Sequence, residues 1–96
     1  MSAYVIANIE VIDSTAFEAY RGMVSATIEK YGGRYLVRGG AHEVLEGAWQ
    51  PYRLVVLEFP SAEQARSWYD SPEYRPAREL RVRATRSHVV FVDGTS

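Results

Sequence analysis

Apolar and polar residues alternate along the segment from Ala3 to Ile12. Every second position from Val5 to Val11 is apolar, and the positions between them form a mixed set: Tyr4, Ile6, Asn8 and Glu10. Because successive side chains of a strand point to opposite faces, this pattern predicts a strand with one buried face. Shorter runs rich in β-branched and aromatic residues predict further strands at 34–38, 53–59 and 87–93.

The hydrophobic period becomes helical after Ser14. Apolar residues recur there on one stripe, which is typical of an amphipathic helix: Phe17, Tyr20, Val24, Ile28 and Tyr31. Thr15 and Glu18 have the spacing of a capping box, and Gly32 stands where a left-handed C-terminal cap is needed. Ser61 predicts the start of a second helix, and Ser71 followed by proline predicts the start of another.

These elements follow one another in the order β-α-β-β-α-β. Strands in this order form one antiparallel sheet with the helices on one face, which is the ferredoxin-like arrangement of the α+β class. The 96 residues have room for one hydrophobic core, so we expect a single domain spanning residues 1–96.

Gly39 and Gly40 lie between two extended runs. The predicted strand 53–59 is longer than residues 44–47 can pair with, which indicates that 34–46 form one long strand bent at the glycine pair. A phosphate-binding loop is excluded because no helix N-terminus follows these glycines. We expect the bend to direct Arg38 toward the face of the sheet that the helices leave uncovered.

That uncovered face is predicted to be unusually apolar. Besides the mixed set of the first strand, it would carry residues from the third and fourth strands: Leu54, Val56, Glu58, His88, Val90 and Val92. A sheet face without helices is normally polar and solvated, and a large apolar patch is unfavourable in water. We therefore predict a homodimer in which a second subunit covers this face.

Of the polar side chains among these apolar positions, the candidates for a site are Asn8, Glu58 and His88. With Arg38 entering from the second strand, they would line a pocket for a small molecule, since such sites combine apolar walls with a few polar groups. His88 has the chemistry of a general base oriented by Glu58 or Asn8. The alternative is that these groups pair with one another or across the interface, as buried charges usually do.

Arg81 differs from the other arginines near the end of the chain. Four of those share one broad face of a helical wheel, which indicates solvated surface: Arg75, Arg78, Arg83 and Arg86. Arg81 falls on the inward side, where it would reach a carboxylate or a ligand. Tyr69 and Tyr74 flank the preceding turn and would have half-exposed hydroxyl groups. The alternative for all three is ordinary packing with one ion pair.

Composition and motifs narrow the function classes. The net charge is −1 and the strands lack the RNA-binding aromatic patterns, so we expect no nucleic-acid partner. The absence of cysteine excludes disulfides, thiolate zinc sites and cysteine nucleophiles. His42 and His88 do not have metal-ligand spacing, and nucleophile, dinucleotide and Walker motifs are absent. We therefore expect neither a metal nor a cofactor.

Export and membrane insertion are not indicated either. The first residues lack the basic and apolar regions of a signal peptide, and no apolar stretch approaches the roughly 20 residues that cross a bilayer. Together with the absence of cysteine, this favours a cytoplasmic location.

Four motifs follow one another between Tyr4 and Val92: "YVIANIEV-D", "YGGRYLVRGG", "VLEG-W-P-R-VVLEFPS" and "A--WYDSPEY----LR". Together they resemble the uncharacterised domain-of-unknown-function family 1330 of the dimeric α/β-barrel superfamily. The resemblance implies a ferredoxin-like protomer and a dimer whose two sheets form a barrel-like core. The superfamily includes cofactor-independent monooxygenases, muconolactone isomerases and haem-degrading enzymes. The family itself has no agreed activity, and a shared fold does not set a reaction.

The sequence leaves two functions open. In the first, the protein binds or transforms a small anionic or carbonyl-containing metabolite, in a pocket between sheet and helices or at the dimer interface. Arg38 would hold the anionic group, and the other candidates would orient it or line the mouth: Asn8, Glu58, Tyr69, Tyr74, Arg81 and His88. The resemblance weakens a catalytic role for His88, because the family pattern has no histidine there. In the second function, these residues form an internal ion-pair network of a non-catalytic dimeric module.

Overall fold

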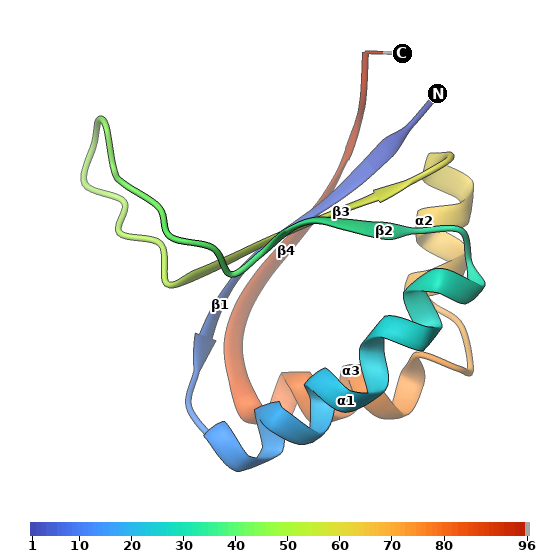
Figure 1. The fold of residues 1–96 in the computed structure, drawn as a ribbon, viewed down its shortest axis with the longest axis horizontal. Coiled ribbons are helices and arrows are strands. Elements are labelled where there is room, and N and C mark those ends of the chain that lie inside the picture. Colours follow the sequence, from blue (N-terminus) through green and yellow to red (C-terminus); the bar gives the residue numbers. More distant parts are fainter. Residues whose placement is uncertain (96) are drawn as a thin grey trace.

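The computed structural model of the protein describes residues 1–95. The strands are β1 (Ala3–Val11), β2 (Arg34–Arg38), β3 (Arg53–Phe59) and β4 (Thr85–Asp93), and the helices are α1 (Ser14–Lys30), α2 (Ala62–Tyr69) and α3 (Arg75–Ala84). The strands form one antiparallel sheet in the order β2-β3-β1-β4, and the helices lie on one face of it (Figure 1). The predicted α+β arrangement is confirmed for the protomer, whose sheet is open at β2 and β4.

Local capping explains where the helices begin and end. The N-cap of α1 is Asp13, whose carboxylate accepts a hydrogen bond from Ala16 N (3.1 Å), so the predicted capping box at Thr15 is wrong. Asp13 comes first in the chain and is an equally good cap. The predicted end of the helix is confirmed, because Gly32 has φ +81° and donates its N–H to Glu29 O at 3.0 Å. Ser61 caps α2 as predicted.

Within residues 1–95, none of the helices has the length and apolarity to cross a membrane.

The second strand is shorter than predicted. It ends at Arg38, and residues 39–52 form a loop, so the long bent strand over 34–46 is wrong. Gly39 takes φ +70° and gives its N–H to Leu54 O (2.8 Å), after which the chain leaves the sheet. In Figure 1 this loop projects away from the sheet on the side opposite the helices. The strand-length argument failed because β3 pairs along its whole length with β1, on its other edge.

A β-bulge in β2 decides which way its side chains point. Arg34 pairs with Glu58 and Tyr35 with Leu57, but Val37 pairs with Val56, so Leu36 is an extra residue. Arg38 is therefore opposite Val55, on the face that packs against the helices. Simple alternation would place Arg34 and Arg38 on the same face, and the bulge separates them.

One face of the sheet packs against the helices. The helix-covered face forms the core with the inner sides of the helices: Val5, Ala7, Ile9, Phe17, Tyr20, Val24, Ile28, Leu57, Phe59, Ala65, Trp68, Tyr74, Ala77 and Ala84. Val11, which alternation assigns to this face, is 37% exposed at the end of β1.

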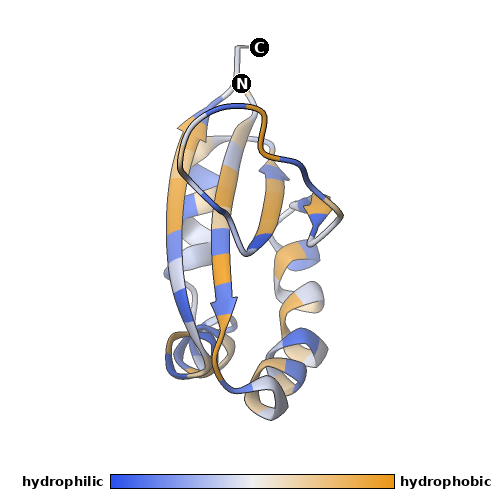
Figure 2. Ribbon diagram, turned by 90° about the vertical axis from the view of Figure 1, so that its left-hand side faces the viewer, coloured by the Kyte–Doolittle hydropathy of each residue, from blue (hydrophilic) through white to orange (hydrophobic). Residues whose placement is uncertain are grey.

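The opposite face is bare in the protomer. Ile6, Val37, Val90 and Val92 are 37%, 40%, 56% and 45% exposed on it. Figure 2 turns this side of the molecule toward the viewer and shows long hydrophobic stretches along the strands. The predicted apolar character of the uncovered face is confirmed.

Candidate functional site

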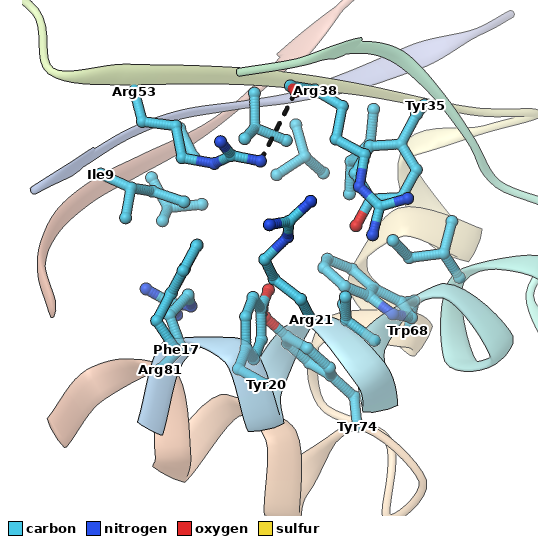
Figure 3. Close-up of a pocket in the computed structure, with 17 residues that line it drawn as sticks. Ile9, Phe17, Tyr20, Arg21, Tyr35, Arg38, Arg53, Trp68, Tyr74 and Arg81 are labelled. Carbon is cyan, nitrogen blue, oxygen red and sulfur yellow. Dashed lines mark hydrogen bonds between the residues drawn. The ribbon is translucent and has the colours of Figure 1, made fainter. Parts of the chain in front are cut away.

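A pocket opens between the covered face of the sheet and the helices (Figure 3). Its walls come from β1, β2, β3 and β4 on one side and from α1, α2 and α3 on the other. It encloses about 550 Å³ including the space open to solvent, but only about 40 Å³ admits the centre of a water molecule. The pocket is therefore a narrow slot.

Four arginines line this slot at different depths: Arg21, Arg38, Arg53 and Arg81. Arg21 and Arg38 are exposed at the mouth, Arg53 is half-buried, and Arg81 is 5% exposed. Arg21 comes from α1, Arg38 and Arg53 come from neighbouring strands, and Arg81 comes from α3. Figure 3 shows the Arg21, Arg38 and Arg53 side chains converging beneath the sheet.

No carboxylate or imidazole is among the residues that line the pocket in the described part of the chain. Arg21 bonds Glu18 outside it (3.1 Å), whereas the other three arginines have no acidic group within ion-pair distance among residues 1–95. Burial and the nearby Arg21 and Arg38 lower the pKa of Arg53. Arg53 Nε is also buried without a hydrogen-bond partner. The pocket thus holds excess positive charge with unsatisfied donor capacity, which an anion would relieve.

Aromatic rings form most of the remaining wall. The Arg53 guanidinium lies 5.6 Å from the centre of the Phe17 ring, and that of Arg38 lies 4.5 Å from the centre of the Tyr35 ring. Trp68 stacks on Tyr74 with ring centres 4.2 Å apart. Rings of this kind fix the guanidinium groups in place and present flat apolar surface to a ligand.

The sequence profile of a known family covers nearly the whole chain. It is that of the domain-of-unknown-function family DUF1330, and it matches residues 2–95. The chain belongs to this family. No curated protein matches it closely enough to add a function to the DUF1330 assignment.

Solved structures share the fold of this DUF1330 chain at low sequence identity. A protein of unknown function from Rhodopseudomonas palustris is 17% identical with a TM-score of 0.79, over 99% of this chain and 83% of that one. A dimeric ferredoxin-like protein of unknown function from Jannaschia is 14% identical with a TM-score of 0.71, over 98% and 100%. SnoaB, a cofactor-independent oxygenase from Streptomyces nogalater, is 11% identical with a TM-score of 0.67, over 99% and 94%. These likenesses show the fold alone.

Three of the residues that the sequence singled out line the pocket: Arg38, Tyr74 and Arg81. Arg81 faces inward, as its place on the helical wheel predicted. The expectation that Arg38 points to the uncovered face is wrong, because the bulge at Leu36 turns it toward the helices. Tyr74 is 1% exposed rather than half-exposed.

The other four candidates of the DUF1330 chain lie elsewhere. Asn8 and His88 are cross-strand neighbours on the uncovered face, where Asn8 Oδ1 accepts the N–H of Tyr52 (2.8 Å). Glu58 lies on the same face, and Arg34, rather than Arg38, bonds it through Nε (2.8 Å) and Nη2 (2.7 Å). Tyr69 packs edge-on against Phe91, away from the pocket.

The ion pair with Arg34 is the main reason that the pKa of Glu58 is lowered. The Arg34 guanidinium, and to a smaller degree the Tyr4 hydroxyl at 3.2 Å, lower the pKa of Glu58, although partial desolvation opposes them. Glu58 is therefore held as a structural carboxylate on the sheet surface. Within residues 1–95, no group of three or more histidine, aspartate or glutamate side chains is arranged to hold a metal ion.

Two pocket arginines were not among the predicted site residues, although the sequence carries a signal for each. Arg21 follows Phe17 by four positions and precedes Val24 by three, so it belongs to the apolar stripe of α1. Arg53 has the same parity in β3 as Val55 and Leu57, which places it on the covered face. In both cases the signal that was missed is an arginine at a position that the hydrophobic pattern assigns to the buried side of its helix or strand.

Proposed function

We propose that this DUF1330 protein binds a small organic anion in the pocket between its sheet and helices. The observation that carries the proposal is the set of four arginines around a slot that contributes no acidic residue. Arg38, Arg53 and Arg81 have no acidic partner among residues 1–95, and Arg53 and Arg81 are half-buried and buried, so a negatively charged ligand would complete the site. The flat aromatic walls favour a planar molecule such as an aromatic or unsaturated carboxylate.

The different depths of the arginines favour one way for the ligand to enter and lie in the pocket. Arg21 and Arg38 at the mouth would attract an anion from solvent, and half-buried Arg53 would hold its charged group. Guanidinium groups bind carboxylates through paired, charge-assisted hydrogen bonds. No carboxylate or imidazole lines the pocket to act as a general base. Any reaction there that begins with loss of a proton would therefore need a substrate acidic enough to ionise without a protein base.

Isothermal titration calorimetry with benzoate tests the proposal. Arg53→Met keeps an apolar side chain against Phe17 but removes the charge, and we expect it to weaken binding at least about tenfold, since a hydrogen bond to a charged group contributes about 1.5–3 kcal/mol. Arg75→Met is the control, because Arg75 is exposed at the start of α3 and does not line the pocket. Equal binding by Arg53→Met and the parent protein would refute the proposal.

We also propose that the protein is a homodimer formed through the uncovered sheet face. The support is the row of exposed apolar side chains on β1, β2 and β4, and the dimeric state named for the Jannaschia protein of the same fold. Burial of that face by a second copy would remove these side chains from water without covering the arginine pocket, which opens on the other side of the sheet.

A further inference from the structure

The arginine pocket has a second polar end on its helix side. There the hydroxyl groups of Tyr20 and Tyr74 lie 3.2 Å apart, and both residues line the pocket. Figure 3 shows them below the converging Arg21, Arg38 and Arg53 side chains, with Phe17 on one side and Trp68 on the other. Tyr20 is 8% exposed and Tyr74 is 1% exposed, so bulk water does not satisfy these hydroxyls.

The tyrosine pair keeps one hydrogen-bond donor unused. Two hydroxyl groups carry two protons, and their mutual hydrogen bond uses only one of them. The Arg81 guanidinium lines the same pocket, and because it can only donate hydrogen bonds it cannot accept the unused proton. The second proton is therefore available to an acceptor in the pocket, which both tyrosines line.

This donor is neutral in the physiological range. Burial, with a smaller contribution from Tyr74, raises the pKa of Tyr20 far above its ordinary value of 10.0. Tyr20 therefore stays protonated and is a hydrogen-bond donor rather than a base. It matches an oxygen acceptor on a ligand, such as a carbonyl or hydroxyl oxygen.

We propose that the ligand has two ends: a carboxylate held by Arg38 and Arg53, and an oxygen substituent that accepts a hydrogen bond from the Tyr20–Tyr74 pair. This inference rests on the proposed function and narrows it to hydroxy- and oxo-substituted flat carboxylates. Phe17 and Trp68 would lie against the ring that joins the two ends. A plain aromatic acid would fill only the arginine end.

Calorimetry with benzoate, 3-hydroxybenzoate and 4-hydroxybenzoate tests this assignment. We expect one of the hydroxy acids to bind the parent protein about fivefold more tightly than benzoate, the effect of one added neutral hydrogen bond. The double variant Tyr20→Phe/Tyr74→Phe removes both hydroxyls of the pair, and it should lose the preference, so that benzoate and the hydroxy acid bind it with equal affinity. Tyr52→Phe is the control, since Tyr52 is 61% exposed and lies outside the pocket.

The outcomes separate this inference from the function on which it rests. If benzoate binds through Arg53 but neither hydroxy acid binds more tightly, the two-ended ligand is refuted and the anion site stands. A preference that persists in the Tyr20→Phe/Tyr74→Phe variant also refutes it. If none of the three acids binds, both proposals fall. Should the double variant not fold, Tyr20→Phe and Tyr74→Phe are tested singly, and a preference that is unchanged in both of them refutes the inference.

Discussion

Gly39 lies directly against the guanidinium group of Arg53, so closely that a Cβ at position 39 would collide with it. Gly39 also has φ +70°, in the left-handed region that favours glycine. The residue that follows β2 therefore leaves room for the arginine at the centre of the pocket. The glycine has two separable roles, one in the backbone and one in the site.

Alanine substitutions at three glycines separate these roles. Gly47 has φ +88° with open space around it, and Gly40 has open space and no positive φ. We expect Gly47→Ala to cost about 1 kcal/mol of unfolding free energy from strain, and Gly40→Ala to cost almost nothing. Gly39→Ala should cost about as much as Gly47→Ala, because the flexible Arg53 side chain can move aside, but it alone should weaken benzoate binding. Chemical denaturation and calorimetry measure the two effects, and equal benzoate binding by Gly39→Ala and Gly47→Ala would contradict the role of Gly39 in the site.

Arg34 and Arg38 are both on β2 but point to opposite faces of the sheet, so each serves as a control for the other. Arg38→Ala should weaken benzoate binding because Arg38 lines the pocket mouth, whereas Arg34→Ala should leave it unchanged because Arg34 bonds Glu58 on the other face. Calorimetric titration of both variants with benzoate therefore tests whether the bulge at Leu36 is present. Equal effects of Arg34→Ala and Arg38→Ala on affinity would show that both side chains lie on one face and that the strand alternates without the bulge.

The Tyr20–Tyr74 hydroxyl pair makes a prediction about stability. Tyr20→Phe or Tyr74→Phe alone leaves one buried hydroxyl without its partner, which costs about 1–3 kcal/mol. The double variant removes both groups and should cost less than the sum of the two single changes. Urea denaturation of the four proteins measures this coupling, and strictly additive losses would show that the two hydroxyls do not interact.

Glu73 links α1 to the turn before α3 and gives the protein a dependence on acid pH. Lys30 Nζ (2.6 Å) and Tyr31 Oη (2.8 Å) donate to its carboxylate, and these hydrogen bonds, that from Lys30 first, lower the pKa of Glu73 from 4.5 to about 2. A lowered pKa stabilises the folded protein above pH 4.5, and this contribution is lost as the pH falls toward 2.

Glu73→Gln should therefore be less stable than the parent protein at pH 7, with the difference shrinking as the pH approaches 2. Denaturation at a series of pH values checks this. Glu79→Gln is the control, since Glu79 is exposed and makes no ion pair within the described residues. A difference between parent and Glu73→Gln that does not change between pH 7 and pH 2 would contradict the prediction.

The uncovered sheet face makes a prediction about oligomeric state. Light scattering should give about twice the 10.9 kDa mass of the chain for the parent protein. Val90→Lys places a charge in the middle of that face and should yield monomers, whereas Val82→Lys makes the same change on exposed α3 and should not. A monomeric parent protein, or a Val90→Lys variant that remains dimeric, would exclude this interface.

The sequence predicted the fold because alternation and helical period are local properties. The buried face of β1, the stripe of α1 and the cap at Gly32 could all be recognised from a few neighbouring residues. The site was harder to predict because four elements contribute its arginines. A single extra residue, Leu36, also reversed the orientation of Arg38, and the chain offers no glycine or proline at that position to signal a bulge.

The most direct test of the arginine pocket is a crystal structure of the protein with bound benzoate. We predict that the carboxylate lies within hydrogen-bond distance of Arg53 and Arg38, with the ring between Phe17 and Trp68 beneath the sheet. A benzoate bound on the uncovered face beside His88 or Arg34, or a pocket left without benzoate at saturating concentration, would contradict this site.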